Sequence, residues 1–308
     1  MRLVRDYAPG ARDSRRTVVA IGNFDGVHIG HQAVIKQVRN LASEKGLLAT
    51  VVCFEPMPRE YFSAAKAPPR LTRLRRKFVL IAKHGIDQLV CLRFNKVMAH
   101  MSAEGFIEHV LIRSLRARYV IVGEDFRFGR DRKGDINLLK EKGNATGFDV
   151  VATATVQVQG ARASSTSVRE ALATGNLKLA AQLLGSPFTL EGHVRHGEKI
   201  GRQLGFPTAN VHTGPYRLPL HGVFAGTITL RDGRRQRAAV SIGTRPVLGK
   251  ISEELLEVHL LDFDENLYGQ RLEVALQTKL RDETGFDGFD ALRVQIERDV
   301  QQVRKLND

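Results

Sequence analysis

Short apolar runs alternate with amphipathic stretches through the first half of the chain. The runs are typical of buried strands and occupy residues 17–24, 47–54, 88–94, 119–122 and 149–155. Between them, apolar residues recur with a helical period over residues 31–45, 70–84, 102–115 and 135–143. Gly46 is a typical helix stop, and Ser102 and Asp135 are typical N-caps. The alternation predicts a Rossmann-like α/β domain, whose parallel sheet binds ligands at the carboxyl ends of its strands.

Two further helices close this domain. Ser167 and Glu170 have the spacing of a capping box, which predicts a helix start within residues 164–185. A second helical pattern covers residues 177–184 and stops at Gly185-Ser186-Pro187. We therefore predict one domain over residues 1–186 and another over residues 187–308.

The pattern changes to short strands after the boundary. They are predicted over residues 189–195, 208–212, 223–230, 238–242, 255–261 and 271–280. Asp232-Gly233 is a hairpin turn signal. Residues 289–304 form a final helical pattern, with Leu292, Ile296, Val300 and Val303 on one face. Six short strands and one helix predict a small antiparallel β-barrel with a C-terminal helix.

The excess of positive charge is confined to the first domain. The chain of 308 residues has 47 Lys and Arg against 33 Asp and Glu, a net charge of +14. Residues 1–186 hold 30 basic and 16 acidic residues, and residues 187–308 hold 17 of each, so the excess of 14 falls in the first part. The basic residues are dispersed, which fits either a solvated surface or a site for phosphate-rich ligands.

Several classes of protein are disfavoured. The chain has no recognised nucleic-acid motif, no Trp and five Tyr, so a nucleic-acid partner is not expected. No apolar run reaches the roughly 18–20 residues of a membrane span, and the first residues lack the apolar core of a secretory signal. Two cysteines cannot build a disulfide framework. We expect a cytoplasmic protein without a membrane partner, and no pattern predicts its oligomeric state.

The glycine-rich stretch Gly22–His31 directly follows the first predicted strand and opens the first predicted helix. Glycines let the backbone approach a ligand closely, and free N–H groups at a helix N-terminus bind anions. His28 and His31 lie one helical turn apart, so both can donate hydrogen bonds to one transferring phosphoryl group. The alternative is a glycine-rich turn with two surface histidines. No Walker-type GxxxxGK[ST] loop occurs in the chain.

This HxGH arrangement is that of the nucleotidyltransferase superfamily. As GNFDGVHIGHQ it resembles the adenylyltransferase half of bacterial bifunctional riboflavin kinase/FAD synthetases, and so do FEPMP (54–58), VGEDFRFG (122–129) and SSTSVR (164–169). The resemblance implies that His28 and His31 are catalytic. It implies ATP or phosphate binding by Gly22, Phe24, Asp25, Gly26, Ser164, Thr166 and Arg169. It implies flavin binding by Phe54, Asp125, Phe126 and Phe128.

The residue types of these stretches suit the implied ligands. Phe126 and Phe128 alternate with Arg127, so an extended segment places both rings on one side and the guanidinium on the other. Aromatic rings can pack on a flavin or adenine, and arginines bind phosphates. The alternative is a strand end with its Phe side chains in the core. Capping alone would explain Ser167, whereas Arg169 lies one turn into the helix and is expected to bind the triphosphate.

The second domain has its own signature in GRQLGFPTAN (201–210), which closely resembles that of riboflavin kinases. Thr208 and Asn210 are two residues apart, so their oxygens face the same way on an extended segment and suit Mg²⁺, which also binds phosphates. Without the resemblance, such a pair is an ordinary strand surface. The resemblance implies ATP binding by Gly201 and Pro207. In EVHLLDFDENLYG (257–269) it implies that Glu257 is the catalytic base.

Together the motifs imply two activities. The second domain would phosphorylate riboflavin to FMN with ATP and Mg²⁺, and the first would adenylylate FMN to FAD and release pyrophosphate. The alternative is a riboflavin kinase whose first domain is inactive or repurposed. Ser241, Val247 and Asn266 depart from the residues common in the family, as does the stretch 284–286. These departures affect the expected flavin contacts more than the chemistry.

Overall fold

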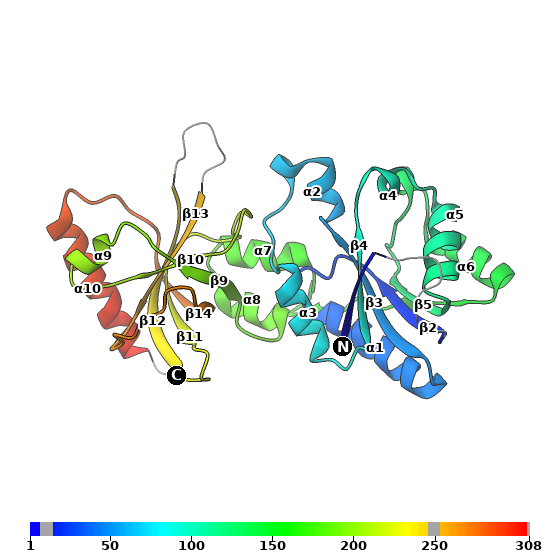
Figure 1. Ribbon diagram of the computed structural model, residues 1–308, viewed down its shortest axis with the longest axis horizontal. Coiled ribbons are helices and arrows are strands. Elements are labelled where there is room, and N and C mark those ends of the chain that lie inside the picture. The colour runs from blue at the N-terminus through cyan, green and yellow to red at the C-terminus, as the bar shows by residue number, and fades with distance from the viewer. Residues whose placement is uncertain (7–14, 246–252, 307–308) are drawn as a thin grey trace. The chain divides into compact units, whose positions relative to one another are not determined.

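The computed structural model describes residues 1–6, 15–245 and 253–306 (Figure 1). Contacts divide the chain into two compact units, one of Met1–Pro68 with Thr72–Ser164 and the other of Pro69–Leu71 with Ser165–Asp308. The helices α7 (Ser165–Ala173) and α8 (Leu177–Leu184) therefore group with the second unit. The boundary between catalytic domains at residues 186 and 187 stays a prediction. Of the sequence departures, Val247 lies outside the described residues.

The first unit is built on a six-stranded sheet in which every paired strand is parallel (Figure 1). The strands lie in the order β1-β4-β3-β2-β5-β6. Their bounds are Arg2–Arg5 for β1, Thr17–Ile21 for β2, Leu48–Glu55 for β3, Gln88–Arg93 for β4, Ala117–Gly123 for β5 and Asp149–Thr153 for β6. The sequence pattern predicts all of these strands except β1, which has only two apolar residues.

Both faces of this sheet are covered, as a parallel sheet requires. Val18 and Ala20 of β2 belong to one apolar cluster, whereas Val19 and Ile21 belong to a second, because successive side chains point to opposite faces. The covering helices include α1 (Ile29–Lys45), α3 (Leu74–Ala82), α5 (Ala103–Phe106) with the π-helical stretch Ile107–Ser114, and α6 (Ile136–Thr146). Short helices are α2 (Pro58–Phe62), η1 (Ala64–Lys66), α4 (Lys96–His100) and η3 (Arg130–Arg132).

The predicted helix ends are mostly confirmed. Gly46 ends α1 with a φ of 64°, Ser102 caps α5, and the Asp135 carboxylate accepts hydrogen bonds from two amides of α6. The capping box at Ser167 is wrong, because α7 begins at Ser165 and places Ser167 within its first turn. Two short strands, β7 (Gln157–Val158) and β8 (Ala161–Arg162), form a hairpin before α7.

The second unit contains a closed antiparallel barrel, as predicted (Figure 1). Its strands lie in the order β10-β13-β12-β11-β14-β9, and Gly233 makes the turn between β11 and β12 with a φ of 87°. Their bounds are Thr189–Arg195 for β9, Ala209–His212 for β10, Gly222–Thr229 for β11, Arg235–Arg245 for β12, Glu253–Leu260 for β13 and Arg271–Arg281 for β14. A short helix, α9 (Ile200–Gln203), precedes β10, and α10 (Phe289–Lys305) packs Val300 and Val303 on the barrel.

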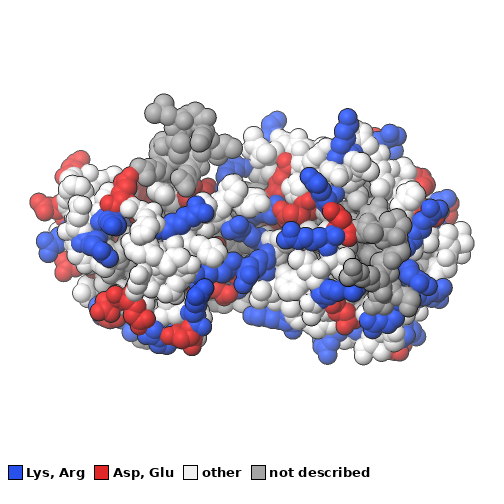
Figure 2. Space-filling model, viewed as in Figure 1, with Lys and Arg blue, Asp and Glu red and all other residues white. Residues whose placement is uncertain are grey.

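The basic residues, which are dispersed along the sequence, are also dispersed on the surface. Lysine and arginine side chains are scattered over the visible face among acidic ones rather than gathered in one stripe (Figure 2). Among the described residues, no helix is both long and apolar enough to cross a membrane.

Candidate active sites

The loop between β2 and α1 brings the two predicted catalytic histidines together. Phe24, Gly26 and Val27 have φ values of 47°, 84° and 45°, which bend the chain sharply from the strand into the helix. His28 then caps α1, and its Nδ1 accepts a hydrogen bond from the His31 amide at 3.3 Å. The two imidazole rings stack with their centroids 3.6 Å apart. One helix start therefore presents both rings side by side.

Asp25 has a different position from the neighbouring loop residues. Its side chain is buried, and its Oδ1 accepts hydrogen bonds from the Thr72 amide at 2.9 Å and the Thr72 hydroxyl at 3.1 Å. The amide of Gly26 in turn donates to the Thr72 hydroxyl at 2.9 Å. These bonds attach the histidine loop to the segment that leads into α3.

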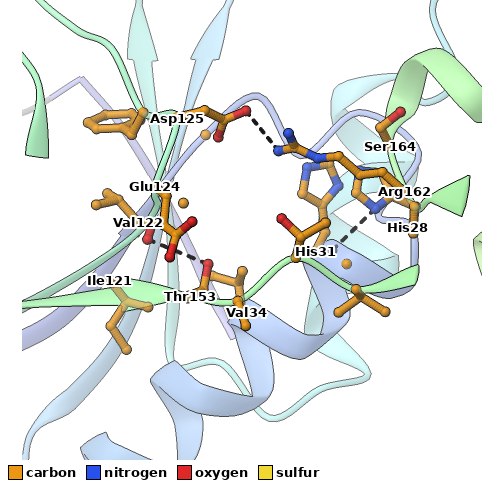
Figure 3. A pocket seen from close by; sticks show the side chains of 18 of the residues that line it. His28, His31, Val34, Ile121, Val122, Glu124, Asp125, Thr153, Arg162 and Ser164 are labelled. Atoms are coloured by element: carbon orange, nitrogen blue, oxygen red, sulfur yellow. Dashed lines mark hydrogen bonds and ion pairs between the residues drawn. The ribbon is translucent and has the colours of Figure 1, made fainter.

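A cavity of about 290 Å³ opens at the carboxyl ends of β2, β5 and β6, where the sheet order predicts a ligand site (Figure 3). It is lined by seven of the predicted residues, namely Gly22, Phe24, His28, His31, Asp125, Phe126 and Ser164. Arg162 also lines it and forms an ion pair with Asp125 at 2.8 Å (Figure 3). The cavity thus combines two imidazoles, a guanidinium and a hydroxyl, which are suitable partners for phosphate groups.

The other predicted residues of this site lie elsewhere. Phe128 is buried in an apolar core, where its ring stacks on Phe126 at 5.4 Å, so the two rings share one side as predicted. Phe54 packs partly buried against the same core. Thr166 and Arg169 belong to α7, and the Arg169 Nε donates to the Pro69 carbonyl at 2.7 Å within the second unit. The assignment of these residues to ligands stays a prediction.

The motif search misses two features near these residues. Arg162 comes two residues before the SSTSVR stretch, and its position opposite Asp125 depends on how the β7–β8 hairpin folds. Tyr61, Phe62 and Phe94 form an aromatic cluster with Phe54, in which the Phe54 and Phe94 rings lie 5.8 Å apart. Phe62 is 67% exposed although it is strongly apolar. Besides Phe54 in FEPMP, the adjacent aromatic residues at 61 and 62 are the sequence signal for this cluster.

Electrostatics keep His31 neutral. Burial lowers the pKa of His31 well below its usual value, and the nearby His28 and Lys77 lower it further. A neutral imidazole carries one N–H group, which can donate a hydrogen bond to a phosphate oxygen without adding a fixed charge. His31 is therefore suited to donating a hydrogen bond rather than to forming an ion pair.

The second candidate site is a row of side chains across three barrel strands. Glu257 on β13 lies directly opposite Asn210 on β10 and Ser241 on β12. Because directly opposed residues point to the same face, the three side chains are neighbours. Ala209 and Val211 on either side of Asn210 are buried, so this row faces away from the barrel core. The predicted base and one predicted metal residue therefore lie together, with the departure at Ser241 beside them.

Glycines hold the neighbouring backbone close to this row. A methyl group on Gly201 would lie 2.5 Å from the Phe206 carbonyl oxygen and 3.3 Å from the Thr208 Oγ1, and one on Gly197 would overlap the Asn210 amide. The Pro207 carbonyl is 2.8 Å from the His259 Nδ1, which attaches the turn before β10 to β13. The backbone at Gly201 and Gly197 therefore comes closer to Thr208 and Asn210 than a residue with a side chain would allow without a shift.

Glu257 has the electrostatic character of a base. Burial raises its pKa above the usual glutamate range, and the carboxylates of Glu198 and Glu283 raise it further.

Asn266, which departs from the residue common in the family, makes a hydrogen bond within its own loop: its Oδ1 accepts from the Tyr268 amide at 2.9 Å. Among the described residues, no group of three His, Cys, Asp or Glu side chains could hold a metal ion.

Family models match both parts of the chain. A family model described as FAD synthetase matches residues 11–167, and one described as riboflavin kinase matches residues 184–307. Together they leave out most of the helical segment that contains α7 and α8.

Individual relatives match nearly the whole chain. The bifunctional riboflavin kinase/FMN adenylyltransferase of Escherichia coli (strain K12) is 44% identical over 288 residues, which are 94% of this chain and 92% of the relative. The protein of the same name from Pseudomonas fluorescens is 44% identical over 306 residues, 99% of this chain and 98% of the relative.

A solved structure from Streptococcus pneumoniae, described as a macrolide-efflux protein, aligns with 27% identity and a TM-score of 0.83 over 99% of each chain. The fold is thus shared over the full length. These matches confirm the predicted resemblance and support the two-activity interpretation over a kinase alone. The chain belongs to the bifunctional riboflavin kinase/FMN adenylyltransferase family and carries both a FAD synthetase and a riboflavin kinase domain.

Proposed function

We propose that the barrel unit phosphorylates riboflavin to FMN and that the cavity of the first unit converts FMN to FAD, each with ATP. The observation that carries this proposal is that each unit contains its own set of suitable residues. His28, His31 and Arg162 line one cavity in the first unit, and Glu257 lies opposite Asn210 in the barrel. The names of the relatives support the same pair of reactions.

In the adenylyltransferase site, the phosphate of FMN is already ionised and attacks the α-phosphorus of ATP. Because the attacking phosphate has no proton to lose, no general base is required, and pyrophosphate leaves from the α-phosphorus. His28 and His31 donate hydrogen bonds to oxygens on which negative charge develops, and the amides at the start of α1 add a positive dipole end. Arg162 exchanges its partner Asp125 for phosphate oxygens. Catalysis here consists of positioning and charge stabilisation.

In the kinase site, Glu257 accepts the proton of the ribityl 5′-hydroxyl as it attacks the γ-phosphate of ATP. The raised pKa of Glu257 makes it a stronger base than an exposed glutamate. The residues present fit Mg²⁺, because Thr208 and Asn210 offer neutral oxygens in the space that Gly197 and Gly201 leave. Mg²⁺ would be held there together with the ATP phosphates, whose charge it would neutralise.

We place both reactions in the cytoplasm. The two cysteines, Cys53 and Cys91, are free and buried, which suits a reducing compartment.

The test follows FMN and FAD separately by chromatography. Glu257→Ala should lower the conversion of riboflavin to FMN by about 10²–10⁴-fold and leave the conversion of added FMN to FAD intact. His28→Ala should lower FAD formation by about 10²–10³-fold and leave FMN formation intact. Glu297→Ala and His100→Ala are matched controls, because both residues are exposed and lie outside the two sites. Loss of both steps in one folded variant would contradict the two-site proposal, and a wild type that makes only FMN would favour the kinase alone.

A further inference from the structure

A buried lysine on α3 has no role in the reactions described above. Lys77 of α3 is 0% exposed, although lysine is rarely buried without a partner. In the described part of the chain its Nζ makes no hydrogen bond. A lone ammonium excluded from water is costly, so a buried lysine of this kind calls for an explanation.

The adenylyltransferase site contains the complementary group. The Nδ1 of His31 is also buried and also makes no hydrogen bond within the described residues. Lys77 is near enough to His31 for its charge to lower the pKa of the imidazole. An ammonium can only donate hydrogen bonds, whereas an unprotonated Nδ1 can only accept one. The two unpaired atoms therefore satisfy each other's requirements.

The backbone fixes α3 relative to the histidine loop. Thr72, which precedes α3 by two residues, bonds to both Asp25 and Gly26. Lys77 also lowers the pKa of Cys91 on β4, on which Cys53 and Glu55 of β3 act as well. The Cys53 hydrogen bond and burial raise the pKa of Cys91, so the Cys91 thiol supplies no negative charge.

The remaining charged groups around His31 are known. His28 stacks on it from the same loop, and Glu124, Asp125 and Arg162 line the cavity. Asp125 is paired with Arg162, and Lys77 is the other cation that acts on His31.

We propose that Lys77 is a positioning residue of the adenylyltransferase site: its ammonium donates to the Nδ1 of His31 through one buried water and holds the imidazole as the neutral Nε2–H tautomer. The proton is then on the nitrogen that can meet a substrate phosphate. The arrangement parallels an enzyme histidine whose tautomer is set by the hydrogen bond at its other nitrogen. This inference rests on the proposed function of His31, and the first test below does not depend on that function.

The first test is an ¹⁵N NMR titration of the histidine rings in the full-length, ligand-free protein. His31→Gln identifies the His31 signals among the ten histidines. The wild type should show an unprotonated Nδ1 and a protonated Nε2 down to low pH. In Lys77→Met the pKa of His31 should rise, because the neighbouring cation is lost, and the Nδ1–H tautomer should appear. Lys83→Met, which removes an exposed charge at the end of the same helix, should change neither. Unchanged His31 signals in Lys77→Met would overturn the proposal.

The second test measures both activities of the same variants. Lys77→Met should lower the kcat of FAD formation by about tenfold or more with little change in the KM for ATP. The acid limb of the pH profile for FAD formation should move to higher pH in this variant, because His31 becomes protonated at a higher pH. Lys77→Arg should restore part of the rate, and FMN formation in the same chain should not change. Methionine retains the volume of lysine and removes an unpaired buried charge, so the variant should fold.

The outcomes separate the inference from the proposed function. If His31→Gln and His28→Ala keep FAD formation, the proposed site is wrong. If they lose it while Lys77→Met keeps both its rate and its pH profile, only the role of Lys77 is wrong.

Discussion

Neighbouring residues of one motif divide into different roles. His28 and His31 face the cavity, whereas Asp25 between the same glycines is buried against Thr72 and holds the loop. A carboxylate pointing at the phosphates would repel them, so its burial removes an unfavourable charge from the site. The motif therefore combines side chains that line the cavity with the bonds that shape the loop.

Glu257 provides a prediction about pH at the same scale. It must be unprotonated to act as a base, so FMN formation should fall as the pH drops through its raised pKa. Glu198→Gln removes a negative charge that raises this pKa, and the acid limb of FMN formation should therefore move to lower pH. The limb is measured from kcat against pH. FAD formation by the same variant should keep its profile, and an unshifted kinase limb would contradict the assigned interaction.

At the scale of elements, local sequence signals are enough to predict many of the helices and strands. The predicted range of β9 matches the strand Thr189–Arg195, and α10 ends one residue after its predicted end. These elements have clear periodicity and turn residues at their ends. Strand β1 has too few apolar residues to stand out, and its identity depends on pairing with β4, 86 residues away at Arg2 and Gln88.

The residues of the two sites also divide into those with a local sequence signal and those that depend on the tertiary structure. His28 and His31 are predictable because one short stretch supplies a strand end, a loop and a helix start. Arg162 and Lys77 are not, because each reaches the site from another element, and only the tertiary structure brings them to the loop. The cross-strand pairing of Glu257 with Asn210 likewise depends on the register between β13 and β10.

The contact between the Gly197 loop and β10 yields a prediction for the kinase. In Gly197→Ala the new methyl group would overlap the Asn210 side chain, so either the loop or Asn210 must move. FMN formation should fall by about tenfold or more, since a displacement of about 1 Å at a site can cost that much or more. Steady-state rates at saturating Mg²⁺ and ATP check this. FAD formation from added FMN is the internal control for folding, and a variant with the wild-type kinase rate would show that Asn210 need not be fixed.

At the scale of the whole molecule, the charge is divided between functions. The excess of 14 positive charges lies in residues 1–186, which contain the adenylyltransferase cavity, and residues 187–308 are neutral overall. Both sites must bind ATP. The barrel has Mg²⁺ as its proposed counter-charge, so a basic surface is not a general requirement for nucleotide binding.

This division predicts different salt dependences for the two activities. The positive charge of residues 1–186 should attract FMN and ATP, both of which are anions, whereas riboflavin is uncharged. Between 50 and 300 mM KCl the screening length falls from about 14 Å to about 6 Å, which removes most long-range attraction. The kcat/KM of FAD formation should therefore fall several-fold, and that for riboflavin in FMN formation should change little. Sucrose at matched osmolarity serves as the control because it does not screen charge. Equal salt dependence of the two reactions would show that the excess charge is solvated surface and does not steer substrates.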